Sequence, residues 1–237
     1  MKKNLIITYG VALHILLIVI LIKPDIVSRI YLKLNLTTIT KSHEYYMNNT
    51  WEFYKRRSNT IDSLSSQCIF FGNSIVSGLC VESQFSGINF GIAGENISRA
   101  KSKISAISNL SNKTIILAYG INDIPRNSED ILNDYKDFIS KLPASSRVFI
   151  SSILPINESI LNKRINQKKT NKQIIELNEL LKEYAKSDSR ISYMNTAKYL
   201  YDEDGSLKDG LHMGDGIHLN KDGNHLWVKA IREELQR

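Results

Sequence analysis

Residues 68–78, which read Cys-Ile-Phe-Phe-Gly-Asn-Ser-Ile-Val-Ser-Gly, decide the fold. Four apolar residues lead into Gly72, and Ser74 follows two positions later. A short, unbroken apolar run that stops at a glycine is typical of a strand buried inside a parallel sheet. Ser74 would then stand at a strand-to-helix turn, where backbone N–H groups without helical partners can stabilise a developing negative charge.

The same alternation of apolar runs and helical spacing continues along the chain. Further strands are predicted at residues 88–90, 114–118, 148–153 and 191–194. Helices are predicted at residues 97–110, 128–142, 172–186 and 224–236. Strands that alternate with helices predict an α/β fold, with a mostly parallel sheet of about five strands covered by helices on both faces. In such folds the active site lies at the carboxyl ends of the strands.

Two later turns would bring hydrogen-bond donors to that same edge. Residues 89–95, Asn-Phe-Gly-Ile-Ala-Gly-Glu, contain a glycine turn at Gly94 whose backbone can approach a substrate closely. Residues 120–123, Gly-Ile-Asn-Asp, follow the most strand-like segment and offer the side-chain amide of Asn122. Both segments are therefore candidates for stabilising an oxyanion.

A cluster near the C-terminus supplies a base. Residues 215–220, Asp-Gly-Ile-His-Leu-Asn, place Asp215 three positions before His218. A serine hydroxyl is a poor nucleophile near neutral pH unless a base accepts its proton, and that base needs a partner to hold its tautomer. The sequence therefore contains a candidate nucleophile in Ser74, a candidate base in His218 and a candidate orienting carboxylate in Asp215.

Taken in order, these four segments resemble the SGNH (GDSL-type) hydrolase family over about residues 67–237. The resemblance implies a flavodoxin-like three-layer α/β/α fold and an activity that needs no cofactor and no metal. It implies that Ser74 attacks an ester carbonyl, with His218 as the base and Asp215 supporting it. The backbone N–H groups of Ser74 and Gly94 and the amide of Asn122 would form the oxyanion hole.

Two features depart from the family pattern. The first segment has Asn73 where the family usually has aspartate, which removes a charge and adds donors. The C-terminal cluster also contains a second Asp-x-x-His unit, formed by Asp209 and His212. The unit at Asp215 fits the family arrangement better, so His212 is expected to be a loop residue near the mouth of the site.

The N-terminus predicts a membrane anchor. Leu5 to Ile22 contains no Asp, Glu, Lys or Arg, and these residues would span roughly 27 Å as a helix, about the thickness of the hydrocarbon layer. No small-residue cleavage pattern follows, which favours an uncleaved anchor over a signal peptide. We therefore predict a single-pass anchor over residues 1–25, a stalk with a helical part over residues 26–66, and an extracytoplasmic catalytic domain over residues 67–237.

The net charge supports this interpretation rather than nucleic-acid binding. The chain carries a formal charge of +7, and residues 1–33 contain five basic residues against one acidic residue. More than half of the excess therefore belongs to the membrane-proximal segment, and the remainder is too small to predict a phosphate-binding surface. The expected partners are an ester-bearing small molecule or glycan and, through the N-terminal helix, the lipid bilayer.

The sequence predicts a membrane-anchored serine esterase that removes acyl groups, such as acetyl, from a cell-envelope or exported glycan. Two alternatives stay open. An acyltransferase would use the same residues and pass the acyl group to a sugar hydroxyl instead of water. A non-catalytic domain of the same fold would bind a glycan or a protein partner, and Asn73 is the feature that favours it.

Overall fold

The computed structural model of the protein describes residue 14 and residues 42–59, 68–166 and 168–236. Within these ranges, no helix has both the length and the apolar character needed to cross a membrane. Apart from His14, the predicted anchor at Leu5–Ile22 lies outside the described residues. Residues Thr50–Arg237 form one compact unit.

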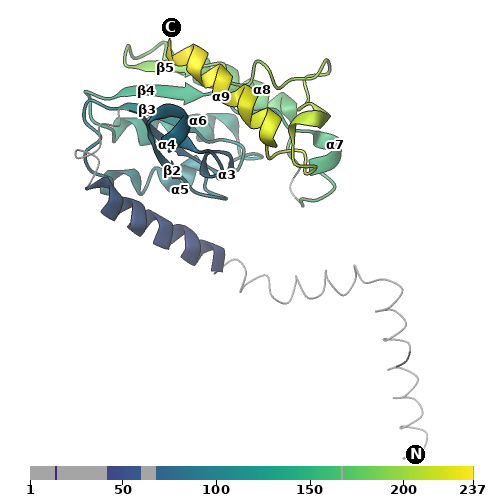
Figure 1. Ribbon diagram of the computed structural model, residues 1–237, viewed down its shortest axis with the longest axis horizontal. Coiled ribbons are helices and arrows are strands. Elements are labelled where there is room, and N and C mark those ends of the chain that lie inside the picture. Colours follow the sequence, from purple (N-terminus) through teal and green to yellow (C-terminus); the bar gives the residue numbers. More distant parts are fainter. Residues whose placement is uncertain (1–13, 15–41, 60–67, 167, 237) are drawn as a thin grey trace, which may run out of the picture. The chain divides into compact units, whose positions relative to one another are not determined.

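A five-stranded parallel sheet forms its centre (Figure 1). The strands are β1 (Cys68–Gly72), β2 (Ile88–Gly91), β3 (Thr114–Ala118), β4 (Arg147–Ser151) and β5 (Ile191–Met194). Their spatial order is β2-β1-β3-β4-β5, which is the order of flavodoxin-like sheets. The predicted α/β fold with about five strands is therefore confirmed.

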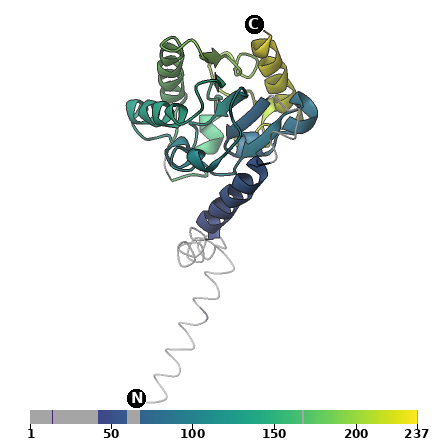
Figure 2. The same cartoon turned by 90° about the vertical axis from the view of Figure 1, so that its left-hand side faces the viewer.

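Helices cover both faces of the sheet. They are α3 (Ser74–Ser77), α4 (Val81–Phe85), α5 (Ile97–Ala100), α6 (Ser128–Ser140), α7 (Glu158–Leu161), α8 (Asn171–Ala185) and α9 (Lys221–Leu235), with 3₁₀ turns η2 (Ile104–Ala106) and η3 (Asp209–Leu211). In Figure 2 the sheet stands between α6 and α8 on one side and α4 and α9 on the other. A further helix covers residues 42–58.

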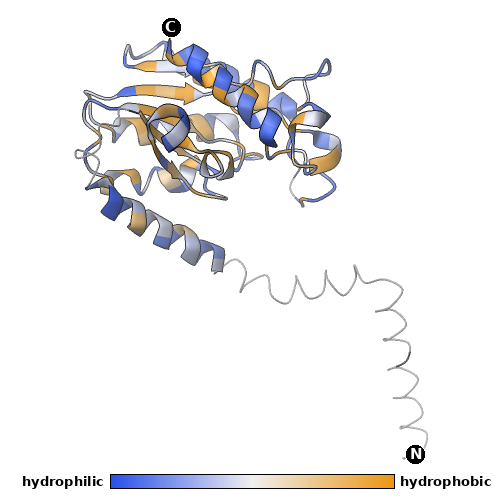
Figure 3. Cartoon of the chain, viewed as in Figure 1, coloured by the Kyte–Doolittle hydropathy of each residue, from blue (hydrophilic) through white to orange (hydrophobic). Residues whose placement is uncertain are grey.

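Successive residues of β1 contribute to the apolar core on opposite faces of the sheet. Phe70 packs in the same apolar cluster as Trp227 and Ile231 of α9, whereas the ring of Phe71 lies 5.9 Å from that of Phe138 in α6. Successive side chains of a strand point to opposite faces, so a strand buried on both faces is apolar throughout. Figure 3 shows this apolar character along the strands of the sheet.

Three of the four predicted helices are confirmed, and the one at residues 97–110 is wrong. Its α-helical part ends at Ala100, and only the 3₁₀ turn η2 follows. The hydroxyl of Ser102 donates to the carbonyl of Arg99 at 2.8 Å. Asn109 adopts a left-handed backbone with φ 61°. Serine side chains that bond the nearby backbone compete with helical hydrogen bonds, which explains the early end.

Strand register brings the predicted site segments to one edge. Gly72, the last residue of β1, pairs with Gly91 at the end of β2 and with Ala118 at the end of β3. The turns that follow these strands therefore start side by side. These are the turns that carry Ser74, Gly94 and Asn122.

Candidate active site

The turn that carries Ser74 is fixed by its two preceding residues. A Cβ added to Gly72 would lie 2.3 Å from a methyl carbon of Val76, so only glycine fits at this strand end. Asn73 is 2% exposed and caps α3, because its Oδ1 accepts from the backbone N–H of Ile75 at 3.0 Å. Asparagine and aspartate are both good N-caps. The departure at Asn73 therefore preserves the local hydrogen bond that positions Ser74.

The imidazole of His218 connects Ser74 with Asp215. The Oγ of Ser74 lies 2.8 Å from Nε2 of His218. On the other side of the ring, Nδ1 lies 2.5 Å from Oδ2 of Asp215. These residues come from the start of α3 and from the loop before α9, separated by more than 140 positions in the chain. The fold thus places the three predicted residues in one continuous hydrogen-bonded line.

Asp215 is held in its charged form. Burial by itself would raise the pKa of this carboxyl, but hydrogen bonds from the ring and backbone N–H of His218 and from the backbone N–H of Ile217 lower it below its ordinary value. Oδ1 accepts from the two backbone groups at 2.9 and 3.1 Å. One carboxylate therefore both shapes the turn and faces the imidazole.

The segments of Gly94 and Asn122 contact each other. Gly94 is exposed and has a φ of +77°, a conformation that favours glycine. Nδ2 of Asn122 donates to the backbone carbonyl of Glu95 at 2.9 Å. An amide group carries two N–H donors, so this bond uses one hydrogen and orients the second. The N–H of Ser74 is at the start of α3, where no earlier helical turn can pair it.

Comparison with known proteins places the chain in a family. The model of the GDSL-like lipase/acylhydrolase family matches residues 70–226, most of the chain. The chain belongs to this family. Its general activity is therefore ester hydrolysis of the SGNH type. No curated protein matches the sequence.

Several solved structures share the fold of this GDSL-like hydrolase. A Streptococcus pneumonia protein described as a platelet activating factor has 21% identity and a TM-score of 0.78, covering 86% of this chain and 99% of that chain. A GDSL-like lipase from Bacteroides thetaiotaomicron has 20% identity and a TM-score of 0.59, covering 77% and 97%. A carbohydrate esterase family 3 protein from Talaromyces cellulolyticus has 15% identity and a TM-score of 0.55, covering 72% and 96%.

The second Asp-x-x-His unit has a different environment. His212 lies in the loop between η3 and α9, as expected, and its side chain is buried. Its Nδ1 accepts from the backbone N–H groups of Gly214 and Gly216 at 2.9 and 3.3 Å. Its Nε2 is 3.7 Å from Asp209, whose side chain is 83% exposed. His212 therefore shapes the loop that carries Asp215, because its acceptor nitrogen is used by that loop's backbone.

Two charged residues support the turn of Asn122, and sequence reasoning assigned them no role. Asp123 is 1% exposed and accepts from the backbone N–H of Ile97 at 3.1 Å. Burial raises the pKa of Asp123 to about 6, although that hydrogen bond opposes the shift. Nζ of Lys169 donates to the carbonyl of Ile121 at 2.6 Å, and burial lowers the pKa of this lysine. Asp123 was visible in the sequence beside Asn122, but nothing in the local pattern marks Lys169.

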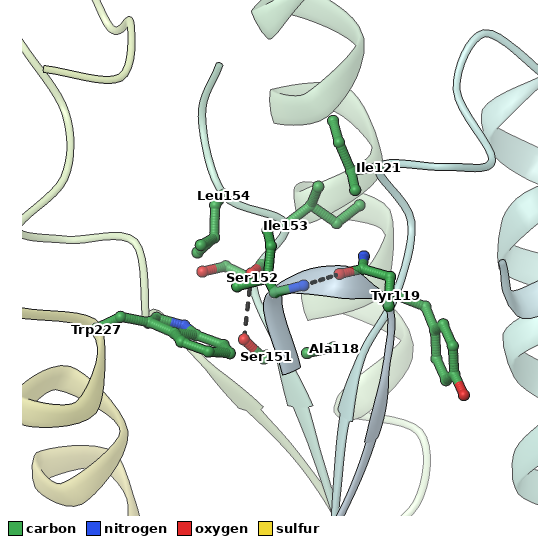
Figure 4. A pocket seen from close by; sticks show the side chains of 10 residues that line it. Ala118, Tyr119, Ile121, Ser151, Ser152, Ile153, Leu154 and Trp227 are labelled. Atoms are coloured by element: carbon green, nitrogen blue, oxygen red, sulfur yellow. Dashed lines mark hydrogen bonds between the residues drawn. The ribbon is translucent and has the colours of Figure 1, made fainter. Parts of the chain in front are cut away.

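A small cavity lies beneath the nucleophile turn and is distinct from the line of Ser74, His218 and Asp215. Its walls come from the ends of β3 and β4 and from α9 (Figure 4), and include Asn73, Ser151 and Trp227. None of the three residues of that line borders it. No cluster of three or more His, Cys, Asp or Glu side chains suited to a metal occurs among the described residues.

Proposed function

We propose that the protein is a membrane-anchored serine esterase in which Ser74 is the nucleophile, His218 the general base and Asp215 its orienting partner. The observation that carries this proposal is the pair of contacts made by the His218 ring, 2.8 Å to Ser74 Oγ and 2.5 Å to Asp215 Oδ2. A hydroxyl, an imidazole and a carboxylate in this order form the arrangement that activates serine for acyl transfer.

In the first step, Ser74 Oγ attacks the ester carbonyl and its proton passes to Nε2 of His218. With the Nδ1 proton shared with Asp215, Nε2 is the nitrogen that accepts. The carbonyl oxygen becomes an oxyanion, which the N–H groups of Ser74 and Gly94 and the Asn122 amide would stabilise. The imidazolium then protonates the leaving alkoxide as the ester C–O bond breaks, which leaves an acyl-serine and a free alcohol.

The second step reverses these roles. A water molecule gives a proton to His218 Nε2 and attacks the acyl carbonyl, so a second oxyanion forms in the same place. When that intermediate collapses, the proton returns to Ser74 Oγ and the carboxylic acid leaves. The side chain of His218 is 41% exposed, so water has direct access to the base.

The proposed substrate is an acyl ester, such as an O-acetyl group, on a cell-envelope or exported glycan. The apolar run Leu5–Ile22 and the lysines before it support anchoring, and a long C-terminal domain is translocated largely regardless of flanking charge. An extracytoplasmic hydrolase tethered to the bilayer would be close to the polymers of the cell envelope. Protease accessibility of the domain in intact cells tests this orientation.

Substitution of the nucleophile tests the proposed chemistry. Ser74→Ala in the full-length chain, purified in detergent, should lose nearly all turnover of nitrophenyl acetate and all labelling by a fluorophosphonate probe. Ser77→Ala is the matched control, since Ser77 is exposed in the same helix and should behave as wild type. Wild-type turnover by Ser74→Ala would refute the assigned nucleophile.

The substrate class needs a separate experiment. Acetylated and chemically deacetylated envelope glycans should differ, with acetate released only from the former and only by the protein with Ser74 intact. Mass analysis of products formed from an acyl donor with and without an oligosaccharide acceptor distinguishes hydrolysis from transfer. Absence of both acetate release and probe labelling in the wild type would favour the non-catalytic alternative.

A further inference from the structure

Residues of the predicted stalk contact the segment that carries Gly94. Trp51, in the helix over residues 42–58, is 4% exposed, and its indole Nε1 donates to Oε2 of Glu95 at 2.6 Å. One turn along the helix, the hydroxyl of Tyr54 donates to the carbonyl of Gly91 at 2.8 Å. Its ring also lies 4.8 Å from that of Phe90. This part of the predicted stalk is thus packed on the strand end from which the Gly94 turn begins.

The Glu95 carboxylate depends on these partners. Its side chain is completely buried, and burying a charge is costly unless hydrogen bonds and opposite charges replace water. Besides Trp51, the backbone N–H of Asn96 approaches Oε1 at 3.3 Å and the Arg99 guanidinium approaches it at 3.8 Å. The indole contact is the shortest of the three. It is also the only one of them that comes from outside the 94–100 segment.

The backbone of the same residue faces the site. The carbonyl of Glu95 accepts from Nδ2 of Asn122 at 2.9 Å. The two N–H bonds of an amide have a fixed angle between them, so holding one hydrogen determines where the other points. A second link joins the two segments, because buried Asp123 accepts from the backbone N–H groups of Ile97 and Ser98 at 3.1 and 3.4 Å. The position of Glu95 therefore controls the direction of the Asn122 amide.

We propose that Trp51 and Glu95 are positioning residues for the oxyanion site, through which the helix preceding the sheet fixes the amide of Asn122. This inference rests on the proposed function, in which that amide stabilises the oxyanion. It extends the hydrolase unit to include residues 50–59, which the sequence assigned to the stalk. Trp51, which the sequence assigned to the stalk, would then contribute to catalysis through the position of Glu95 and the direction of the Asn122 amide.

Trp51→Phe in the full-length chain tests the inference, because it keeps an aromatic ring but removes the donor. Removal of a complete oxyanion donor costs about 10²–10³-fold in kcat, and displacement of one should cost less, about tenfold. We expect kcat for nitrophenyl acetate to fall about tenfold with KM unchanged, at a temperature well below the unfolding transition of the variant. Glu52→Gln, an exposed neighbour in the same helix, should match the wild type.

A double-mutant cycle with Asn122→Ala separates positioning from general damage. If Trp51 acts through Asn122, Trp51→Phe should produce no further loss of kcat in the Asn122→Ala background. An equal tenfold loss of kcat in both backgrounds would overturn the inference. The inference would also fail if Trp51→Phe kept the wild-type kcat while Ser74→Ala abolished activity. If Ser74→Ala and Asn122→Ala both keep wild-type activity, the proposed function itself fails.

Discussion

Substitution of Asp215 by asparagine should inactivate the protein without unfolding it. Oδ1 of Asp215 accepts from the backbone N–H groups of Ile217 and His218 at 3.1 and 2.9 Å, and an asparagine oxygen can accept both. The loop should therefore keep its shape. The third bond differs, because the amide nitrogen of asparagine would face Nδ1 of His218 and donate to it.

That reversal changes the tautomer of the imidazole. Nδ1 would become the acceptor, the proton would move to Nε2, and Nε2 would then donate to Ser74 Oγ, 2.8 Å away, instead of accepting its proton. The equivalent substitution in serine proteases lowers kcat about 10⁴-fold, which corresponds to roughly 5.4 kcal/mol in the activation free energy. We expect a loss of this order in kcat/KM for nitrophenyl acetate, with a thermal unfolding midpoint close to that of the wild type.

The matched control comes from the other Asp-x-x-His unit. Asp209 is 83% exposed and lies 3.7 Å from the buried ring of His212, so Asp209→Asn should keep kcat/KM within about twofold. Both variants lose one negative charge, which removes net charge as an explanation. If Asp215→Asn retains more than a tenth of the wild-type kcat/KM, or if Asp209→Asn is the inactive variant, the assignment of the orienting carboxylate is wrong.

Two further predictions concern the residues that support the Asn122 turn. Lys169→Met removes the donor that bonds the carbonyls of Ile121 and Ile124, so both kcat and the free energy of unfolding should fall, the latter by about 1–3 kcal/mol. Steady-state kinetics and urea unfolding measure these two effects. Lys168 is exposed, and Lys168→Met should show neither effect. Burial raises the pKa of Asp123 to about 6 from an ordinary 3.8, so between these values the folded state binds a proton that the unfolded state does not. The Asp123 contribution to the unfolding free energy should therefore fall by about 2 kcal/mol as pH rises from 4 to 7. Asp123→Asn should abolish that part of the pH dependence in urea titrations, and identical pH profiles for variant and wild type would contradict it.

The fold was predictable because its signals are local. The strands were predicted from apolar runs that end at a glycine or a turn. Their alternation with helices predicts a parallel sheet. The exception, residues 97–110, shows the limit of such signals. Isoleucine spacing there favours a helix, but the serine hydroxyls and Asn109 compete for the backbone, and tertiary packing decides between them.

For the candidate site, the residue types and their order were predictable from the amino-acid sequence: a serine after the first strand, a glycine turn and an amide after the next two, and an aspartate and a histidine before the last helix. The family arrangement favoured His218 over His212, although both follow an aspartate by three positions. The contact itself, 2.8 Å from His218 Nε2 to Ser74 Oγ, is a product of the tertiary structure. The tertiary structure also decided that Trp51 reaches Glu95 across 44 positions and that Lys169 reaches the Asn122 turn. The two kinds of feature differ in the distance along the chain over which they act. A strand or a helix cap depends on a few neighbouring residues, whereas the partner of a buried charge depends on how distant segments pack.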